Sequence, residues 1–335
     1  MQTIKLIDDI IATAISMVAS DIHFEPGQDY LRIRLRIDGV LQQQQQLPVT
    51  AAASIVSRLK ILANLDIAEK RIPQDGNFTI KASSAQQRDS DCRVSTCPTI
   101  FGEKVVLRLL DPCTMQADIN SLGLEDFQKQ LFLQAIKQPQ GIILVTGPTG
   151  SGKTITLYTA LKLLNSPERN IVTCEDPVEM HLPGINQVNV HNKIGLDFST
   201  ALRAFLRQDP DIIMIGEIRD SDTAQIAFKA AQTGHLVLAT LHSNDTMAAI
   251  SRLMNLGIAK HEILAATILI TAQRLVRKIS NTGYTGRTGI FEMLPITAGV
   301  INTDLYTLAQ AGNYKVQQNI TTIEEIHRVY GNNNF

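Results

Sequence analysis

The segment that most constrains this chain is a glycine-rich stretch between an apolar run and a helical pattern. Residues 147–154 read GPTGSGKT, which matches G-x-x-x-x-G-K-[ST] in full. The run GIILVT at 141–146 directly precedes it and has the continuous apolar character of a buried strand. Residues 153–164 then follow the pattern of a helix. A strand, a glycine-rich turn and a helix in this order predict a phosphate-binding loop.

Each residue type in this loop has a physical task. Glycines let backbone N–H groups curl around phosphate oxygens, and the helix N-terminus adds its partial positive charge. Lys153 is expected to reach the β- and γ-phosphates, and the Thr154 hydroxyl is expected to ligate Mg²⁺. The sequence therefore predicts ATP and Mg²⁺ as ligands. The predicted nucleotide-binding residues are Gly147, Pro148, Thr149, Gly150, Ser151, Gly152, Lys153 and Thr154.

Apolar strand patterns alternate with helical patterns around this loop. Strands are predicted at 141–146, 170–174, 211–216 and 235–241, and helices at 153–164, 198–206 and 223–232. Such alternation predicts an α/β fold with a parallel sheet covered by helices on both faces. Further along, a long helix is predicted at 261–278, a glycine-rich turn region at 283–289, and one helix in the tail at 323–330. The part from about residue 246 is therefore expected to be helical.

Residues 1–112 have a different pattern, which predicts a small α+β domain. The run LRIRLRI at 31–37 alternates strictly, with apolar residues on one face and arginines on the other, as a half-buried strand does. Asp38-Gly39 follows as a hairpin turn. The remaining predictions are a helix over the first twenty residues, a helix at 51–65, a turn at 73–76 and a strand at 103–110. A linker is expected at 113–122, and a second domain at 123–335.

Three polar residues each end a predicted strand. Glu175, Glu217 and His242 end the second, third and fourth strands, and open parallel sheets bind ligands at this edge. Glu217 is expected to hold Mg²⁺ or orient water, and Glu175 to act as a general base, although the two roles could be exchanged. Helix-capping or solvated carboxylates are the alternative for both. His242 could sense the γ-phosphate, whereas His235 at the opposite end of its strand is expected to pack or support an interface.

Paired arginines are a further group of candidate site residues. Arg203 and Arg207 are four positions apart on one predicted helix face, and Arg32, Arg34 and Arg36 share one strand face. A motor that fires in sequence around a ring needs cations supplied to the phosphates by a neighbouring subunit. The alternative is a solvated basic face whose ion pairs have little energetic value.

Composition excludes several other classes of protein. The 335 residues are 44% hydrophobic and 19% charged with a net charge of −1, as in ordinary globular proteins. The chain has no tryptophan and only 5% aromatic residues, which argues against a helicase with a basic, stacking groove. The four cysteines form no C-x-x-C pair, so reduced thiols in a cytoplasmic protein are expected. Neither a signal peptide nor a bilayer-spanning stretch is present, so membrane association is expected to be peripheral.

Ordered segments across residues 19–295 resemble the type II secretion and type IV pilus assembly ATPases. In the first part these are ASDIHFEP (19–26), RIDG (36–39), RIPQDG (71–76), RVST (93–96) and GEKVVLR (102–108). In the second part they are the phosphate loop, the "Asp box" EDPVE (175–179), GEIRD (216–220) and a "His box" from TGH (233–235) to His242.

The resemblance implies a RecA-like ATPase domain preceded by a small α+β, PAS-like domain. It implies a homo-hexameric ring that drives a polytopic membrane platform protein, which in turn lifts pilins into a filament, with no direct binding of nucleic acid. Glu175 and Glu217 would be the catalytic acids, and His235 and His242 the two family histidines. The resemblance therefore makes His235 a stronger candidate for the site than its position at the start of the strand does. Arg36, Arg93 and Arg108 would approach the neighbour's nucleotide.

Two departures from the family pattern narrow the expectation. Secretion-type members carry a C-x-x-C…C-x-x-C zinc loop after a segment like 273–278, and no such cysteines occur here, so no zinc is expected. Those members also begin with an extra platform-docking domain, for which this chain has no room. Both features resemble the short ATPase of the Gram-positive competence pseudopilus, which supports DNA uptake. A secretion, type IV secretion or retraction motor and an ATP-binding scaffold with little turnover remain the alternatives.

Overall fold

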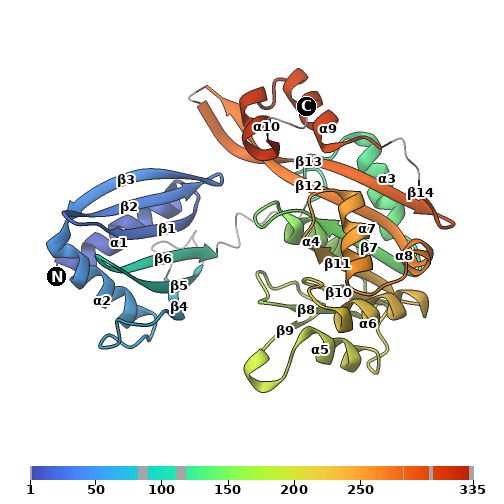
Figure 1. The fold of residues 1–335 in the computed structure, drawn as a ribbon, viewed down its shortest axis with the longest axis horizontal. Helices are drawn as coiled ribbons and strands as arrows, with labels where there is room; N and C mark the ends of the chain where they lie inside the picture. The colour runs from blue at the N-terminus through green and yellow to red at the C-terminus, as the bar shows by residue number, and fades with distance from the viewer. Residues whose placement is uncertain (1, 82–89, 111–117, 282, 302–304, 332–335) are drawn as a thin grey trace. The chain divides into compact units, whose positions relative to one another are not determined.

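The computed structural model describes residues 2–81, 90–110, 118–281, 283–301 and 305–331. The chain divides into two compact units, Met1–Met115 and Gln116–Phe335 (Figure 1). The first half of the predicted linker, residues 113–117, lies outside the described residues and includes Cys113. No helix in the described ranges combines the length and the apolar character that crossing a membrane requires.

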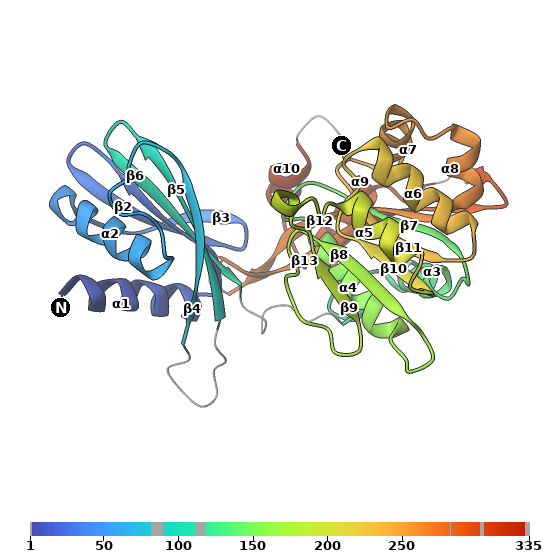
Figure 2. The ribbon, with the colours of Figure 1, turned by 90° about the horizontal axis from the view of Figure 1, so that it is seen from below.

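The first unit is an antiparallel sheet with two helices on one face. Its elements are α1 (Gln2–Ser16), β1 (Ala19–Pro26), β2 (Tyr30–Ile37), β3 (Val40–Pro48), α2 (Ala52–Leu62), β4 (Gln74–Ile80), β5 (Ser90–Thr99) and β6 (Gly102–Leu110). The strand order is β3-β2-β1-β6-β5-β4. Apolar residues of both helices and of the facing strands form one core, and Figure 2 shows both helices on the same side of the sheet. The predicted turn at 73–76 is wrong in part, because β4 already begins at Gln74.

Strand β2 shows how the sequence builds this unit. Leu31, Ile33 and Leu35 are buried in the core beneath the helices, as the alternating pattern predicts. The arginines between them therefore stand on the sheet face that the helices leave open. The glutamine run at 42–46 continues the sheet as part of β3, where it is mostly exposed.

The second unit is built on a sheet whose order is β14-β13-β12-β7-β11-β10-β8-β9. Its strands are β7 (Gly141–Thr146), β8 (Ile171–Glu175), β9 (Asn186–Asn189), β10 (Ile212–Ile215), β11 (Leu236–Leu241), β12 (Thr267–Ser280), β13 (Gly283–Thr297) and β14 (Val300–Ile301). The six strands from β12 to β9 are parallel, and β13 runs antiparallel to β12. The predicted α/β fold with a parallel sheet is confirmed.

Helices cover both faces of this sheet. They are α3 (Asp126–Ile136), α4 (Lys153–Leu164), α5 (Phe198–Phe205), α6 (Ser221–Gln232), α7 (Thr246–Asn255), α8 (Lys260–Ala266), α9 (Leu308–Gln317) and α10 (Ile323–Tyr330). Strand β7 contributes Ile143 and Val145 to the core with α3 and α4, and Ile142 and Leu144 to the core with α5 to α8. A strand buried on both faces reads as a continuous apolar run, which is why GIILVT identified it.

The C-terminal part departs from the sequence prediction. The helix predicted at 261–278 is confirmed only as far as Ala266, where α8 ends, and is wrong beyond it, because the chain continues as the fourteen-residue strand β12. The glycine-rich turn region predicted at 283–289 is also wrong, since these residues form the first half of β13. The part from about 246 is therefore mixed rather than helical. The tail helix at 323–330 is confirmed as α10, and α9 was not predicted.

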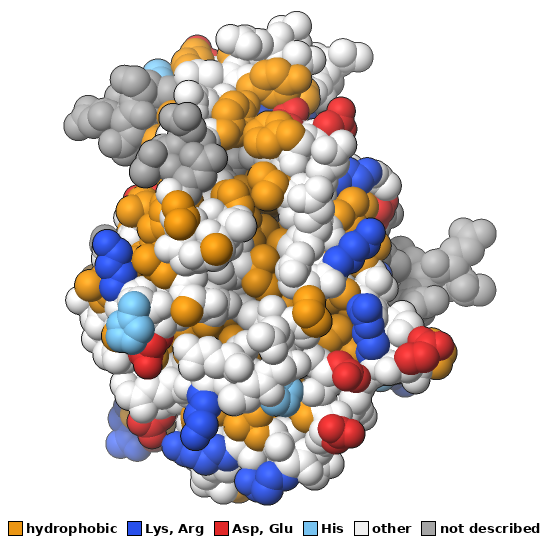
Figure 3. Space-filling view, turned by 90° about the vertical axis from the view of Figure 1, so that its right-hand side faces the viewer, with side chains coloured by type: hydrophobic (Ala, Val, Ile, Leu, Met, Phe, Trp, Pro, Cys, Tyr) orange, Lys and Arg blue, Asp and Glu red, His pale blue; other side chains and the backbone are white. Residues whose placement is uncertain are grey.

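Figure 3 shows the face of the protein seen from the right-hand side of Figure 1, where hydrophobic side chains are interspersed with polar ones and Lys and Arg lie along the right-hand side and the lower edge. Charged side chains of both signs are present on this face, as on ordinary globular surfaces. The face alone therefore does not indicate a particular partner.

Candidate active site

The phosphate loop leaves β7 at Thr146 and enters α4 at Lys153. Gly147 has φ +148°, and a Cβ at this position would lie 2.6 Å from the carbonyl oxygen of Gln273, so only glycine fits. Gly152 caps α4 in the left-handed region at φ +90°. Among the described residues, no side chain caps this helix N-terminus, and nothing lies within 4 Å of a Cβ built on Gly150. The first-turn N–H groups and the open loop form a cradle that suits a phosphate.

Lys153 is folded back onto the loop. It is 9% exposed, and its Nζ donates hydrogen bonds to the carbonyl oxygens of Gly147 at 2.9 Å and Pro148 at 3.1 Å. Burial lowers the pKa of Lys153 to about 8; the charge of Arg274 acts in the same direction, and that of Glu217 opposes it. An anion held by the loop would raise the pKa of this amine again.

Glu217 and His242 meet at the carboxyl edge of the sheet. Glu217 follows β10 and His242 follows β11, and Glu217 Oε2 lies 3.3 Å from His242 Nε2. Burial and the charge of Lys153 lower the pKa of His242, and the nearby Glu217 only partly offsets them. These effects favour the neutral imidazole, which donates a hydrogen bond from one nitrogen and accepts one at the other.

Arg219 extends this cluster toward the second strand. Its Nη2 contacts Glu217 Oε1, and its Nη1 lies 3.9 Å from Asp176, the residue after Glu175. Arg219 lies within the GEIRD segment, but sequence reasoning did not single it out. Its position two residues after Glu217 was the available signal, because the chain leaves the strand edge at this point.

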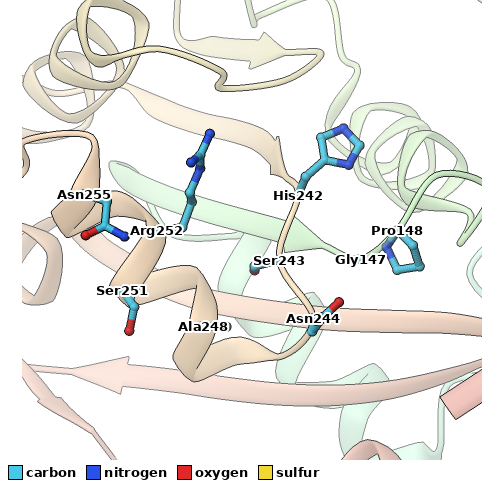
Figure 4. Close-up of a pocket in the computed structure, with 9 residues that line it drawn as sticks. All are labelled: Gly147, Pro148, His242, Ser243, Asn244, Ala248, Ser251, Arg252 and Asn255. Carbon is cyan, nitrogen blue, oxygen red and sulfur yellow. The ribbon is translucent and has the colours of Figure 1, made fainter. Parts of the chain in front are cut away.

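A cavity of about 470 Å³ adjoins the loop. In Figure 4, Pro148 and His242 flank one end of this cavity, and Ser251, Arg252 and Asn255 of α7 line the other. The cavity is thus continuous with the phosphate loop and with the residues that follow β11. It offers room beside the position expected for the terminal phosphate.

Glu175 is held by hydrogen bonds inside the fold rather than pointing into this cavity. The side chain is 3% exposed. Tyr158 Oη donates to Glu175 Oε2, and the hydroxyl of Thr173 and Nε2 of Gln187 donate to Oε1 at 2.5 and 3.1 Å. Tyr158 lies on α4, five residues after Lys153, so this carboxylate is tied to the helix that begins at the phosphate loop.

The other predicted catalytic residues of this unit lie elsewhere. His235 precedes β11 at the edge opposite to His242, roughly 20 Å away by strand rise, and its Nδ1 lies 3.0 Å from the Ala230 carbonyl oxygen. Arg203 contacts Ser199 and, at 3.5 Å, Asp222, and Arg207 donates to the Arg203 carbonyl oxygen. None of these interactions joins the three side chains to the phosphate loop.

The three arginines proposed to act on a neighbour share one row of the first unit. The ladder places Arg36, Asp21, Arg108 and Arg93 opposite one another on β2, β1, β6 and β5. Arg108 Nε donates to Asp21 at 3.0 Å, and Arg36 Nε lies 3.6 Å from the same carboxylate. Arg93 directly opposes Arg108, and two like charges in this position repel each other. The row therefore favours an additional anion.

The magnesium site at Thr154 and Glu217 stays a prediction. Both side chains carry the hard oxygen ligands that Mg²⁺ prefers. Elsewhere, the described residues include no group of three or more His, Cys, Asp or Glu side chains arranged to hold a metal ion. The described cysteines, Cys92, Cys97 and Cys174, are free thiols.

Comparison with known proteins identifies the family. A family model described as "Type II/IV secretion system protein" matches residues 1–328. The chain belongs to this family. It is 49% identical over 343 residues to the "Protein transport protein HofB homolog" of Haemophilus influenzae, covering 98% of this chain and 74% of that protein. It is 43% identical over 383 residues to the "Type IV pilus assembly ATPase PilB" of Acinetobacter baylyi, covering 97% of this chain but only 66% of that protein.

Solved structures agree on the fold. The pilus retraction motor PilT with bound ADP is 29% identical, with a TM-score of 0.64, over 96% of this chain and 91% of that one. The ATPase DotB of Legionella pneumophila is 22% identical with a TM-score of 0.77, over 96% and 94% of the two chains, and supports the fold alone. The family resemblance drawn from the motifs is thus confirmed, while its competence subtype is not decided by these relatives.

Proposed function

We propose that this chain binds Mg-ATP at the Gly147–Thr154 loop and hydrolyses it. The observation that carries the proposal is the contact between Glu217 and His242 at the sheet edge, within electrostatic reach of the buried Lys153. A buried cation with a lowered pKa, an exposed helix N-terminus and an acid–imidazole pair around one loop suit phosphoryl transfer to water.

Each side chain then has a role. Lys153 exchanges its loop carbonyls for phosphate oxygens, which raises the pKa of its amine again, and the first-turn N–H groups of α4 hold the same phosphates. Thr154 and Glu217 would hold Mg²⁺, which neutralises charge on the β- and γ-phosphates. Glu175 is the proposed general base, a role that requires its carboxylate to turn from Tyr158 toward the nucleotide. His242 is proposed to sense the terminal phosphate. His235, Arg203 and Arg207 are proposed to act through contacts between copies, since no contact within the described residues ties them to the phosphate loop.

We further propose that the chain works as a homo-hexameric motor at the cytoplasmic face of a membrane. The motor would act on a polytopic platform protein and, through it, on pilins of a type IV pilus-like filament. Relatives named for pilus assembly and for secretion, over nearly the whole of this chain, support this class. A competence pseudopilus for DNA uptake is our preferred pathway, and a secretion or retraction motor fits the same relatives equally.

The catalytic proposal is tested with two variants of the full chain. Lys153→Ala removes the cation and is expected to abolish both binding of a fluorescent ADP analogue and turnover. Glu217→Gln is expected to keep nucleotide binding within about threefold and to lose at least about a hundredfold in kcat. A wild-type protein that assembles into rings but shows no turnover above Lys153→Ala would instead favour an ATP-binding scaffold.

Action of arginines across copies is tested by mixing subunits. Arg108→Ala and Glu217→Gln are each expected to be inactive alone. If Arg108 serves a neighbour, mixed rings regain turnover wherever an intact Glu217 meets an intact Arg108. The same mixture tests Arg36 and Arg93. If rings shown to contain both variants do not recover ATP turnover, the arginines do not act on a neighbouring subunit's nucleotide.

The pathway is tested by its partner and its substrate. Purified protein is expected to bind membranes only when they contain a polytopic pilus or secretion platform protein, and single-stranded DNA is expected to leave ATP turnover unchanged. Strong stimulation by single-stranded DNA or RNA would favour a nucleic-acid motor instead.

A further inference from the structure

Strand β12 continues past the end of its neighbour β7 and runs beside the phosphate loop. Its pairing with β7 ends at Ala272, opposite Thr146, and the residues beyond pair with β13 alone. Gln273 and Arg274 are the first two residues past that point. Both are polar and nearly fully buried, with exposed fractions of 1% and 6%. Long polar side chains are rarely buried without a specific partner, so their contacts identify what they do.

Gln273 bridges the phosphate loop to the helix that follows it. Its Nε2 donates to the carbonyl oxygen of Ser151 at 2.6 Å, and its Oε1 accepts from the hydroxyl of Thr156 at 2.8 Å. The carbonyl oxygen of Gln273 also lies where a side chain on Gly147 would have to go. One residue thus binds the loop at Ser151 and the first turn of α4 at Thr156, and lies against the start of the loop at Gly147.

Arg274 makes the equivalent contact with the loop that carries His242. Its Nη2 donates to the carbonyl oxygen of Asn244 at 2.9 Å, and its Nη1 donates to the carbonyl oxygen of Gln273 at 3.0 Å. Asn244 lies two residues after His242. A shift of β12 along its axis would therefore move the phosphate loop and the His242 loop together.

We propose that Gln273 and Arg274 are positioning residues for nucleotide binding and for turnover, respectively. Gln273 holds the loop in the conformation that receives phosphates, so its loss weakens binding of every phosphate-bearing nucleotide. Arg274 holds His242 beside Glu217, so its loss slows the chemical step without weakening the binding of ADP. The inference rests on the proposed ATP hydrolysis and adds which residues set affinity and which set rate.

The expected effects follow from the contacts. Gln273→Met keeps the length of the side chain but removes both hydrogen bonds, which corresponds to about a five- to thirtyfold higher Kd for ADP. Gln273→Glu, which cannot donate to the Ser151 carbonyl oxygen, is a second variant for the case that Met is not tolerated. Arg274→Met is expected to lower kcat at least about tenfold while the Kd for ADP stays within about twofold.

Gln128 provides a matched control. It is another glutamine with 1% exposure, on α3, and it also makes two hydrogen bonds. Its Nε2 donates to the Phe291 carbonyl oxygen at 2.7 Å, and its Oε1 accepts from the Glu125 N–H at 3.1 Å. Neither bond involves a loop of the site. Gln128→Met is therefore expected to lower the melting temperature like Gln273→Met but to leave ADP affinity within about twofold of wild type.

The test measures Kd for a fluorescent ADP analogue with Mg²⁺, and kcat and KM for ATP, on the full chain. A rise in Kd for Gln273→Met or Gln273→Glu, with a fall in kcat alone for Arg274→Met, supports the inference. The inference is overturned if Gln273 variants bind ADP within twofold of wild type, if Gln128→Met loses as much affinity, or if Arg274→Met loses affinity in parallel with rate. If wild type and Lys153→Ala both fail to bind nucleotide, the proposed function itself fails, which is a different outcome.

Thr156 gives a second, independent check. Thr156→Ser keeps the hydroxyl that Gln273 accepts from and is expected to bind ADP like wild type. Thr156→Val removes it and is expected to share part of the Gln273 defect. Combining Thr156→Val with Gln273→Met is expected to cost no more than about twofold beyond Gln273→Met alone, because both changes break the same bridge. Fully additive losses would contradict the bridge.

Discussion

Replacing Glu325 by glutamine is expected to loosen the tail helix α10 from strand β12. Glu325 is 1% exposed and holds two arginines. The Arg277 side chain donates to Oε2 at 3.0 and 2.7 Å, its backbone N–H donates to Oε1 at 3.0 Å, and the Arg328 guanidinium donates to both oxygens at 2.7 Å. Glutamine has nearly the same shape, but it removes the negative charge and replaces one acceptor with a donor.

The size of the effect follows from the pKa of this carboxyl group. Burial raises the pKa of Glu325, but the hydrogen bonds from Arg328 and Arg277 outweigh it and lower the pKa from 4.5 to about 2. At about 1.4 kcal/mol per pH unit, this difference corresponds to about 3.5 kcal/mol of folding free energy at most. Because the Arg328 side chain is 41% exposed, solvent screens its share, and we expect about 2 kcal/mol.

The pH dependence has a definite sign. The folded-state pKa lies below the unfolded-state value, so the stabilisation is fully present above about pH 4.5 and is lost as the pH falls from there toward 2. Wild type and Glu325→Gln should therefore differ by about 2 kcal/mol at pH 7 and by about half as much at pH 3.

Urea unfolding followed by tyrosine fluorescence measures this difference, because five of the six tyrosines lie in the second unit. Glu324→Gln is the control: it changes the same charge on the same helix turn at an exposed position and should cost less than about 0.5 kcal/mol. A cost below about 0.5 kcal/mol for Glu325→Gln at pH 7, or one that does not shrink at pH 3, would refute the reasoning.

Three further changes probe the site and the two cores. Tyr158→Phe removes a donor from Glu175 and should lower kcat about tenfold while the Kd for ADP stays within about twofold, as steady-state kinetics and ADP titration can determine. Glu103→Gln leaves the buried Lys60 without its carboxylate 2.5 Å away and should destabilise the first unit by about 3 kcal/mol in thermal unfolding, with most of the loss recovered when Lys60→Met is combined with Glu103→Met. Burial raises the pKa of the Cys92 thiol to about 12 and also raises the pKa of the Cys174 thiol. In a Cys113→Ser variant, a thiol reagent at pH 8 should therefore modify the exposed Cys97 at least tenfold faster than either buried thiol. Equal rates would show that these cores open readily.

The sequence predictions that the structure confirms rest mainly on residues that are adjacent in the chain. The strand, phosphate loop and helix around residues 141–164 are adjacent in sequence, and the loop's chemistry depends on residue types at fixed spacing. The meeting of Glu217 and His242 followed from one topological rule, because residues that end parallel strands share a sheet edge. Glu175 shows the limit of that rule. It ends its strand at the same edge, yet its carboxylate turns toward Tyr158, and sequence position does not set side-chain direction.

Strand β12 was missed because its local pattern is ambiguous. Apolar residues in 263–276 recur at spacings compatible with a helix, and short apolar runs do not separate helix from buried strand. Several β-branched residues favoured a strand, among them Thr267, Ile268, Ile270 and Thr271. Pairing with β7, more than 120 residues earlier, decides between them. Local propensity is a weak determinant wherever a sheet offers an open edge to pair with.

The same long-range pairing explains why the residues that shape the site were invisible in the sequence. Gln273 reaches Ser151 across 122 positions, and Arg274 reaches Asn244 across 30. Neither contact belongs to a sequence motif of phosphate binding, since both follow from β12 lying next to β7 and continuing beyond it. The motif therefore specifies which atoms meet the phosphates, while a neighbouring strand specifies the conformation in which they do so. A chain with the same GPTGSGKT loop but a different strand beside β7 would keep the phosphate-binding groups of the loop but not the conformation that aligns them.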